Sequence, residues 1–225
     1  MRILALDGAL ARCSAALWED GALRAAGGLH AARGHPSVLP PLVARILAEA
    51  GREAAGLDAV AVGVGPGGFT GLRAALALAR GLAQGVGAAL IGVTTGEALA
   101  AALPAEHRSG RAVWALIDTR RGRFLLERFA PGGETPLGPP EALDETALPT
   151  PPGPVALVGD AAPQAAARLL ARGHDALLGD PRMPDATRIA AIAALRLAGS
   201  LPPRDASPLY GEAPAVRRPG VAVAL

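Results

Sequence analysis

The order of the apolar periodicities in the first hundred residues constrains the fold of this chain more than any other feature. Period-two runs come first and indicate three strands of a meander, at residues 2–7, 12–18 and 22–29. Helical spacing and buried strands then alternate, with helices expected at 36–50, 70–84 and 96–103 and strands at 57–65 and 88–93. The resulting order, βββαβαβα, predicts an α/β domain in which the meander continues into parallel strands.

The same order is that of one half of a protein of the actin, hexokinase and Hsp70 type (the ASKHA fold), a half that is duplicated in a full molecule. After residue 104 the pattern returns in a shorter form. It predicts a hairpin from 111–118 and 123–129, a strand at 154–160, and helices at 162–172 and 187–198. We therefore expect two subdomains, residues 1–104 and a smaller, shortened one at residues 105–225.

Proline and glycine set several element boundaries. Pro40 and Pro41 are compatible only with the first turn of a helix, so the helix at 36–50 is expected to start late. Gly51 stands where its C-terminal cap belongs. The stretch 130–154 is too rich in proline for a helix and is expected to be a loop, and the tail from residue 207 is expected to be extended.

Composition limits the function classes. All 22 basic residues are arginine, the formal net charge is only +2, and 3% of the residues are aromatic, which disfavours a protein that binds nucleic acid on its own.

Cys13 is the only cysteine, so the chain cannot form an internal disulfide, and this residue is expected in the core. Asp7 interrupts the first apolar stretch, which indicates a strand and not a signal peptide, and no run approaches the roughly 20 residues that cross a bilayer. We expect a soluble cytoplasmic protein with no membrane partner.

The stretch VGVGPGGFTGLR, residues 62–73, raises the question of phosphate binding. It contains the spacing G-x-G-x-x-G at Gly63, Gly65 and Gly68. A dinucleotide site is disfavoured because the first acid after the loop, Glu97, is too distant, and because the loop follows the fourth strand and not the first. A Walker-type loop is excluded because the chain has no lysine.

The alternative is that these glycines serve packing. A tight strand-to-helix turn, a cap from the Thr70 hydroxyl and a close neighbour of Gly71 are then expected. The core stripe of the following helix is predicted to be Leu72, Ala75, Leu76, Ala79, Leu82 and Ala83. A second face holds Arg73, Ala77, Arg80 and Gln84. Small residues between arginines allow close approach, so this face is a candidate contact between subunits.

The segment GPGGFTGLRAALALARGLA resembles the GPGSFTGLR signature of the TsaB (YeaZ) family. Further pieces agree in order, namely ILALD, ARGHPSVLPPLVARILAEAG, IDTRRGRF and PLY. The resemblance implies the dimerisation subunit of the bacterial machinery that makes threonylcarbamoyladenosine beside the tRNA anticodon. It implies a non-catalytic accessory subunit that pairs with a metal-bearing TsaD-type paralogue, with a TsaE-type small ATPase as a further partner and tRNA reached through the complex. Both a heterodimer and, without the paralogue, a homodimer are compatible with the same surface.

On this resemblance, the partner interface is expected at the helix opened by the glycine loop, with the helix at 36–50 as a second contributor. Its expected residues are Gly67, Phe69, Thr70, Gly71, Leu72, Arg73, Leu76, Ala77 and Arg80. Direct tRNA contact would use Arg120 and Arg121, or Arg217 and Arg218 near the C-terminus.

In the TsaD-type paralogue, the corresponding helix carries H-x-x-x-H, whose two histidines ligate a metal. This chain has Thr95 and Leu99 at those places, so no catalytic residue and no metal are expected, and the metal and ATP or ADP are assigned to partner subunits. The four histidines lie far apart in the sequence, at His30, His35, His107 and His174. His35, at a helix entrance, is expected to be a capping or surface residue.

Asp7 and Gly8 are the candidate nucleotide-binding residues, because the fold begins its first phosphate hairpin there. The family commonly has D-T-S at this point, whereas this chain has Ala9 and lacks both hydroxyls. A different class of function, a small ATPase or kinase of the same fold, would need that hairpin and a second phosphate loop, where only Gly159 and Asp160 fit. ATP-dependent stabilisation of the isolated protein would distinguish this alternative.

Overall fold

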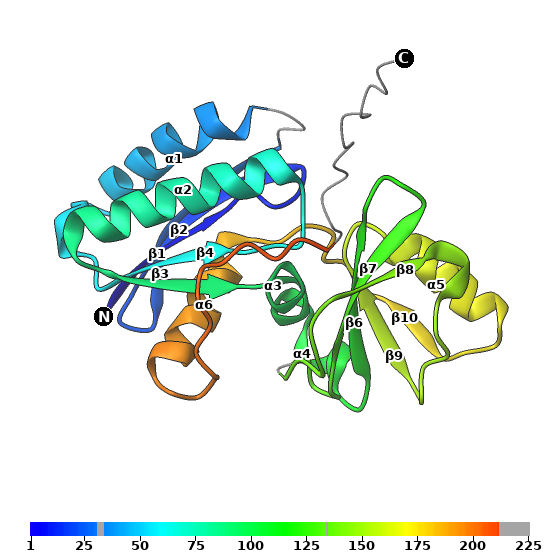
Figure 1. Ribbon diagram of the computed structural model, residues 1–225. Coiled ribbons are helices and arrows are strands. Elements are labelled where there is room, and N and C mark those ends of the chain that lie inside the picture. The colour runs from blue at the N-terminus through cyan, green and yellow to red at the C-terminus, as the bar shows by residue number, and fades with distance from the viewer. Residues whose placement is uncertain (31–33, 134, 212–225) are drawn as a thin grey trace, which may run out of the picture.

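The computed structural model describes residues 1–30, 34–133 and 135–211, and Arg217 and Arg218 lie outside these ranges. Within them, two five-stranded sheets stand side by side, each with its own helices (Figure 1). This is the α/β, ASKHA-type arrangement of two subdomains that the sequence predicts. No helix in the described ranges combines the length and the apolar character that crossing a bilayer requires.

The first sheet has the strand order β3-β2-β1-β4-β5. Its strands are β1 (Arg2–Asp7), β2 (Arg12–Glu19), β3 (Ala22–His30), β4 (Ala59–Gly63) and β5 (Ala89–Val93). The first three pair antiparallel, and β1, β4 and β5 pair parallel, so the meander that continues into parallel strands is confirmed.

Helices cover both faces of this sheet. They are α1 (His35–Glu49), α2 (Phe69–Val86) and, on the opposite face, α6 (Ala186–Leu197), with the short 3₁₀ turn η1 at Ala54–Gly56. Alternate residues of β1 point to opposite faces, so Leu4 and Leu6 pack with α1 and α2, while Ile3 and Ala5 pack with α6. Both faces of the central strands are therefore buried.

Helix α1 begins earlier than predicted. It starts at His35 and contains both Pro40 and Pro41 in its interior, where neither can donate a backbone hydrogen bond. Both prolines face solvent, so water can reach the carbonyl groups that lose a donor, while the other side of the helix packs on the sheet. Gly51, with φ of 62°, follows the helix as expected, and the Arg52 N–H donates to the Leu47 carbonyl.

The second sheet has the order β10-β9-β6-β7-β8. Its strands are β6 (Ala112–Asp118), β7 (Arg123–Phe129), β8 (Glu141–Asp144), β9 (Val155–Val158) and β10 (Ala176–Leu178). The hairpin β6–β7 is confirmed. The expected loop at 130–154 is wrong in part, because β8 pairs with the edge of β7 and is followed by the 3₁₀ turn η2 (Glu145–Ala147), and β10 was not anticipated.

Three further helices lie in the described ranges. Helix α5 (Ala162–Ala171) covers the second sheet, and α3 (Thr95–Ala102) and the short α4 (Ala105–Arg108) lead from the first sheet to the second. Helix α3 contacts both α6 and β6, and it lies between the two sheets in Figure 1.

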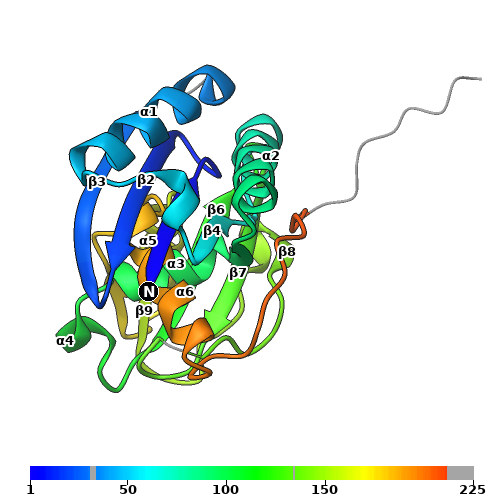
Figure 2. The ribbon, with the colours of Figure 1, turned by 90° about the vertical axis from the view of Figure 1, so that its left-hand side faces the viewer.

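The chain returns to the first subdomain at its end, so the predicted boundary at residue 104 is wrong for the last part. Helix α6 packs on the first sheet, and the following segment runs along the edge strand β5, where the Gly92 N–H donates to the Arg204 carbonyl at 3.1 Å. Figure 2 shows this segment rising toward the start of α2. We call residues 204–210 the C-terminal strap.

Candidate functional site

The glycine loop between β4 and α2 packs against the turn that follows β1. The Gly68 N–H donates to the Ala9 carbonyl oxygen at 2.6 Å, and a Cβ on Gly67 would collide with that same oxygen. The backbone of Gly8 approaches α2 as closely, since a Cβ there would lie 2.9 Å from the Gly71 carbonyl oxygen. The loop therefore uses its glycines for close packing of backbone on backbone, as the packing interpretation predicts.

The expected cap from Thr70 is wrong. Helix α2 begins one residue earlier, at Phe69, its N-cap is Gly68, and no side chain caps it. Thr70 lies exposed in the first turn. The loop backbone is fixed by its contact with the β1 turn, so the helix starts where that contact ends and not where a hydroxyl is available.

Helix α2 separates its two faces much as the sequence predicts. Five of the six expected core residues are buried and Leu82 is partly buried. Leu72 is 0% and Leu76 8% exposed, so these two residues of the expected interface contact the chain's own core, as does the buried Gly71. Their assignment to a partner interface is therefore wrong.

The outer face of α2, as defined here, consists of the exposed residues Phe69, Thr70, Arg73, Ala77, Arg80, Gly81, Gln84 and Gly85. Gly81 and Gly85 were not among the residues predicted for this face. Their spacing was available as a signal, since Ala77, Gly81 and Gly85 recur every four residues and so share one side of a helix. A Cβ on either glycine would have nothing within 4 Å, so the chain's own packing does not require a glycine at either place.

An aromatic cluster lies at the N-terminal end of this face. The Arg73 guanidinium lies 3.6 Å from the centre of the Phe69 ring, and its Nε donates to the Tyr210 hydroxyl at 2.9 Å. Phe69 is 56% and Tyr210 45% exposed. Tyr210 belongs to the PLY motif, but its contact with a helix 137 residues earlier is not visible in the sequence.

The C-terminal strap holds Tyr210 in place. The Leu209 N–H donates to the Val64 carbonyl at 2.8 Å, and Arg80 Nη2 reaches the Ala206 carbonyl at 3.5 Å. Two arginines of the outer face, Arg73 and Arg80, are thus positioned by the strap.

The candidate nucleotide residues Asp7 and Gly8 are brought together but are enclosed. Asp7 is fully buried, its Oδ2 accepts the Ala9 N–H at 3.3 Å, and its Oδ1 lies against Gly63 without a hydrogen-bond partner in the described residues. Burial raises the pKa of Asp7 to about 7. A phosphate would have to displace the packing of this turn on the glycine loop, so the residues present do not fit one in this arrangement.

The second loop of interest, at Gly159 and Asp160, serves the β6–β7 hairpin. Asp160 Oδ1 accepts the Asp118 N–H at 2.9 Å, and its Oδ2 pairs with Arg120 at 3.3 Å. Burial, the largest influence, raises the pKa of Asp160. Arg120 lies exposed in the hairpin turn with φ of 59°, beside the exposed Arg121, so both reach the surface where tRNA contact was predicted.

Thr95 and Leu99, at the two places where the resemblance implies histidines in a paralogue, lie inside this molecule. The Thr95 hydroxyl donates to the Pro66 carbonyl at 2.8 Å, and Leu99 is packed in the core. Across the described ranges, no three His, Cys, Asp or Glu side chains gather closely enough to hold a metal ion. The side chain of Thr95 instead ties α3 to the glycine loop.

Glu97 and Glu127 form a buried pair of carboxyl groups between the two sheets, which was not predicted from the sequence. Thr94 and Glu97 form a capping box at the start of α3, and the Thr94 hydroxyl donates to Glu127 Oε1 on β7 at 3.0 Å. The other oxygen of Glu127 lies against Gly96 with no hydrogen-bond partner among the described residues. Burial, and then the charge of Glu97, raise the pKa of Glu127 to about 8.

Comparisons with known proteins match this architecture. The family model described as TsaD, tRNA N6-adenosine threonylcarbamoyltransferase, matches residues 22–158. The Escherichia coli tRNA threonylcarbamoyladenosine biosynthesis protein TsaB is 41% identical over 129 residues, which cover 57% of this chain and only 55% of that protein. The chain thus spans about half the length of this curated relative.

Two solved structures cover nearly the whole chain. A Pseudomonas aeruginosa protein described as similar to the peptidase YeaZ has a TM-score of 0.79 and 26% identity, covering 94% of this chain and 99% of its own. YeaZ from Pseudomonas aeruginosa has a TM-score of 0.77 and 28% identity, covering 93% and 99%. The chain therefore belongs to the family that the TsaD model describes, and within it to the TsaB (YeaZ) proteins.

Proposed function

We propose that this chain is a non-catalytic accessory subunit in tRNA threonylcarbamoyladenosine biosynthesis, and that it binds a metal-bearing TsaD-type paralogue through the outer face of α2. In this proposal the metal, ATP or ADP and a TsaE-type small ATPase belong to the partner side, and tRNA is reached through the complex. The names of the relatives support the pathway, and the geometry of α2 supports the surface. Without the paralogue, the same face supports a homodimer.

The observation that carries this proposal is the pair of exposed glycines within α2. A glycine in the interior of an exposed helix destabilises it by about 1 kcal/mol relative to alanine. Gly81 and Gly85 have open space where a Cβ would stand, so nothing in the chain itself compensates that loss. Close approach of a second helix is a use that would compensate it, because only small residues allow two helix backbones to come near.

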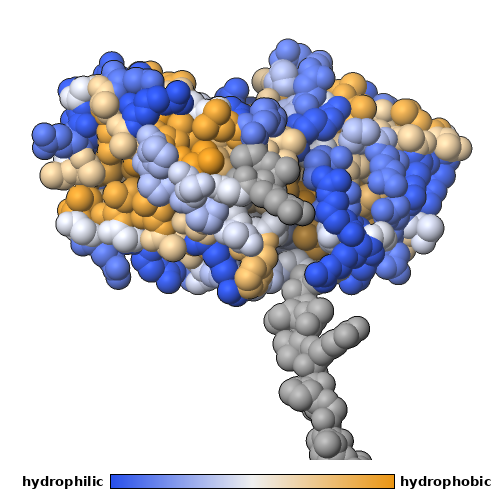
Figure 3. Space-filling view, turned by 90° about the horizontal axis from the view of Figure 1, so that it is seen from above, coloured by the Kyte–Doolittle hydropathy of each residue, from blue (hydrophilic) through white to orange (hydrophobic). Residues whose placement is uncertain are grey.

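The surroundings of these glycines support the same use. Hydrophobic residues gather over the half of the molecule that carries α1 and α2 (Figure 3). Phe69, Arg73 and Tyr210 lie at the N-terminal end of the outer face of α2. Arginine and tyrosine are among the residue types that contribute most binding energy at interfaces, and phenylalanine is enriched there. The face therefore combines close helix contact with an arginine and aromatic anchor.

The non-catalytic part of the proposal is supported by what occupies the expected chemical positions. The Thr95 hydroxyl is committed to the glycine loop, Leu99 is in the core, and Asp7 is enclosed by backbone. No observation favours the alternative of a small ATPase or kinase over this proposal.

The test is calorimetric titration of the full chain with the TsaD-type paralogue from the same organism, followed by a tRNA modification assay with and without the chain. Gly81→Leu is expected to weaken association at least about tenfold, since its side chain would separate the helices. The matched control is Ala167→Leu, at an exposed position of α5 on the other subdomain. It should bind as the wild type does.

Wild-type binding together with restored modification would support the accessory role. Equal effects of Gly81→Leu and Ala167→Leu would overturn the α2 surface while leaving the role open to another surface. Absence of binding together with ATP turnover by this chain alone would replace the proposal with the small ATPase or kinase.

A further inference from the structure

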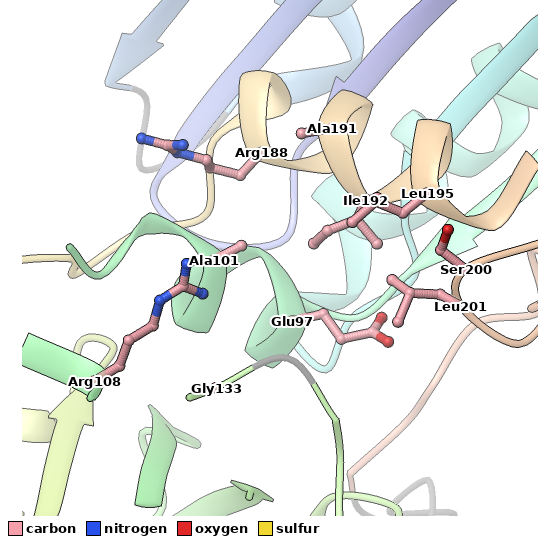
Figure 4. A pocket seen from close by; sticks show the side chains of 10 residues that line it. All are labelled: Glu97, Ala101, Arg108, Gly133, Arg188, Ala191, Ile192, Leu195, Ser200 and Leu201. Atoms are coloured by element: carbon pink, nitrogen blue, oxygen red, sulfur yellow. The ribbon is translucent and has the colours of Figure 1, made fainter. Parts of the chain in front are cut away.

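A cavity of about 290 Å³ opens between α3 and α6 (Figure 4). Arg108 and Gly133 line it on the side across from α6. It lies on the opposite side of the first sheet from α1 and α2, because α6 covers the other face of that sheet. The cavity is therefore separate from the proposed partner surface.

One end of this cavity is apolar. In Figure 4, Ile192, Leu195 and Leu201 gather at the end nearer the turn after α6, and Ala101 contributes a methyl group from α3. A ligand would gain from placing apolar surface there, at about 25 cal/mol per Å² removed from water.

The other end is cationic. Arg188 extends from α6 on one side of this end, and Arg108 reaches toward α3 from α4 on the other side, so two guanidinium groups line it from two walls (Figure 4). Within the described ranges, neither guanidinium has a hydrogen bond or an ion pair to another residue. Both charges are thus available to a ligand.

Among the described residues that line the cavity, Glu97 is the one acid, and it does not neutralise the two arginines. Glu97 Oε1 accepts from Arg196 Nη2 at 2.5 Å, and its Oε2 accepts the Thr94 N–H at 2.8 Å. Arg204 stands 3.7 Å from the same carboxylate. Glu97 is therefore compensated within the protein, and the described lining residues leave a net positive charge at the arginine end.

We propose that this cavity binds a small organic anion, a carboxylate or a phosphate monoester joined to an apolar group. Guanidinium groups bind both anions with paired hydrogen bonds, and the apolar end fits the remainder of such a molecule. A volume of 290 Å³ holds about ten water molecules, so the ligand is of the order of ten non-hydrogen atoms.

The test is calorimetric titration of the full chain with four probes that share a six-carbon chain: hexyl phosphate, hexanoate, hexanol and hexylammonium. Hexyl phosphate or hexanoate is expected to bind about tenfold or more tightly than hexanol, with no binding of hexylammonium. The tighter of the two anions identifies the class of headgroup.

Variants locate the binding. Arg108→Gln and Arg188→Gln are each expected to weaken binding of the better anion about tenfold, and Ala191→Leu, which fills the cavity from α6, should abolish it. Arg45→Gln, at an exposed arginine of α1 on the opposite side, is the control and should bind as the wild type does. Equal affinity for hexanol, equal loss with Arg45→Gln, or no detectable binding at about 10 mM of either anion would overturn the proposal.

Discussion

At the scale of single residues, burial decides what the carboxyl groups of this protein can do. Asp7 and Glu127 each have one oxygen with a hydrogen-bond partner and one without among the described residues. The sequence located Asp7 because it interrupts an apolar run, but it suggested a phosphate hairpin where the structure has close packing. Nothing in the sequence indicated that Glu127 would be buried, because its burial arises from the packing of α3 on the second sheet. Its hydrogen-bond partner Thr94 lies 33 residues earlier in the chain.

The raised pKa of Glu127 predicts a pH-dependent stability. Its folded pKa of about 8 lies above the ordinary 4.5, so its contribution is fully present below about pH 4.5 and is lost as pH rises through 8. In the wild type, the free energy of unfolding should therefore fall by on the order of a few kcal/mol, relative to Glu127→Gln, between pH 5 and 9. Urea unfolding at pH 5, 7 and 9 measures this difference.

The control for this pH dependence is Glu141→Gln, because Glu141 is an exposed carboxyl on β8 of the same sheet. Its difference from the wild type should stay nearly constant over the same range. If Glu127→Gln and Glu141→Gln show the same dependence, the buried carboxyl is not its source.

At the scale of elements, periodicity was sufficient for the long helices and the central strands but not for their ends or for short edge strands. Strands β8 and β10 are four and three residues long and lie at the edges of their sheet, so too few residues alternate to form a pattern. The start of α1 was misplaced because solvent on its outer side tolerates prolines that a buried helix would not. The outer face of α2 was predicted from spacing, but Gly81 and Gly85 were not.

Glycines of the same segment predict opposite effects on stability. Gly81→Ala should raise the free energy of unfolding by about 1 kcal/mol, because its Cβ meets open space in the middle of a helix. Gly67→Ala should lower it by about 1–3 kcal/mol, because its Cβ would collide with the Ala9 carbonyl oxygen. Chemical denaturation of the isolated chain measures both.

If Gly81→Ala stabilises the chain while weakening association with the paralogue, the glycine serves the partner and not the fold. A loss of stability in Gly81→Ala would instead contradict the open space beside this residue. Gly67→Ala with wild-type stability would show that the glycine loop can move away from the β1 turn.

At the scale of the whole molecule, the chain builds the first subdomain from both of its ends. The sequence could not show this, because the apolar stripe of a helix does not itself specify which sheet it covers. Ile189 and Ile192 cover the face of the first sheet that carries Ile3 and Ala5. Within residues 1–104, the helical residues on this face are only Ala98 and Ala101 of α3, so most of its cover comes from α6.

A fragment of residues 1–104 is therefore expected to lack cooperative unfolding and to bind a hydrophobic dye, whereas the full chain should unfold in a single sigmoidal step. Circular dichroism during urea titration, with dye fluorescence in parallel, makes the comparison. A sharp transition in the fragment at the midpoint of the full chain would contradict the contribution of α6.

Tyr210, held by Arg73 where the C-terminal strap meets α2, is the single tyrosine of the chain. Biosynthetic replacement by 3-fluorotyrosine would therefore give one fluorine resonance, from a ring that is exposed and adjacent to the outer face of α2. Its chemical shift and line width would follow docking at that face without any added label. The molecule thus contains its own spectroscopic probe of assembly.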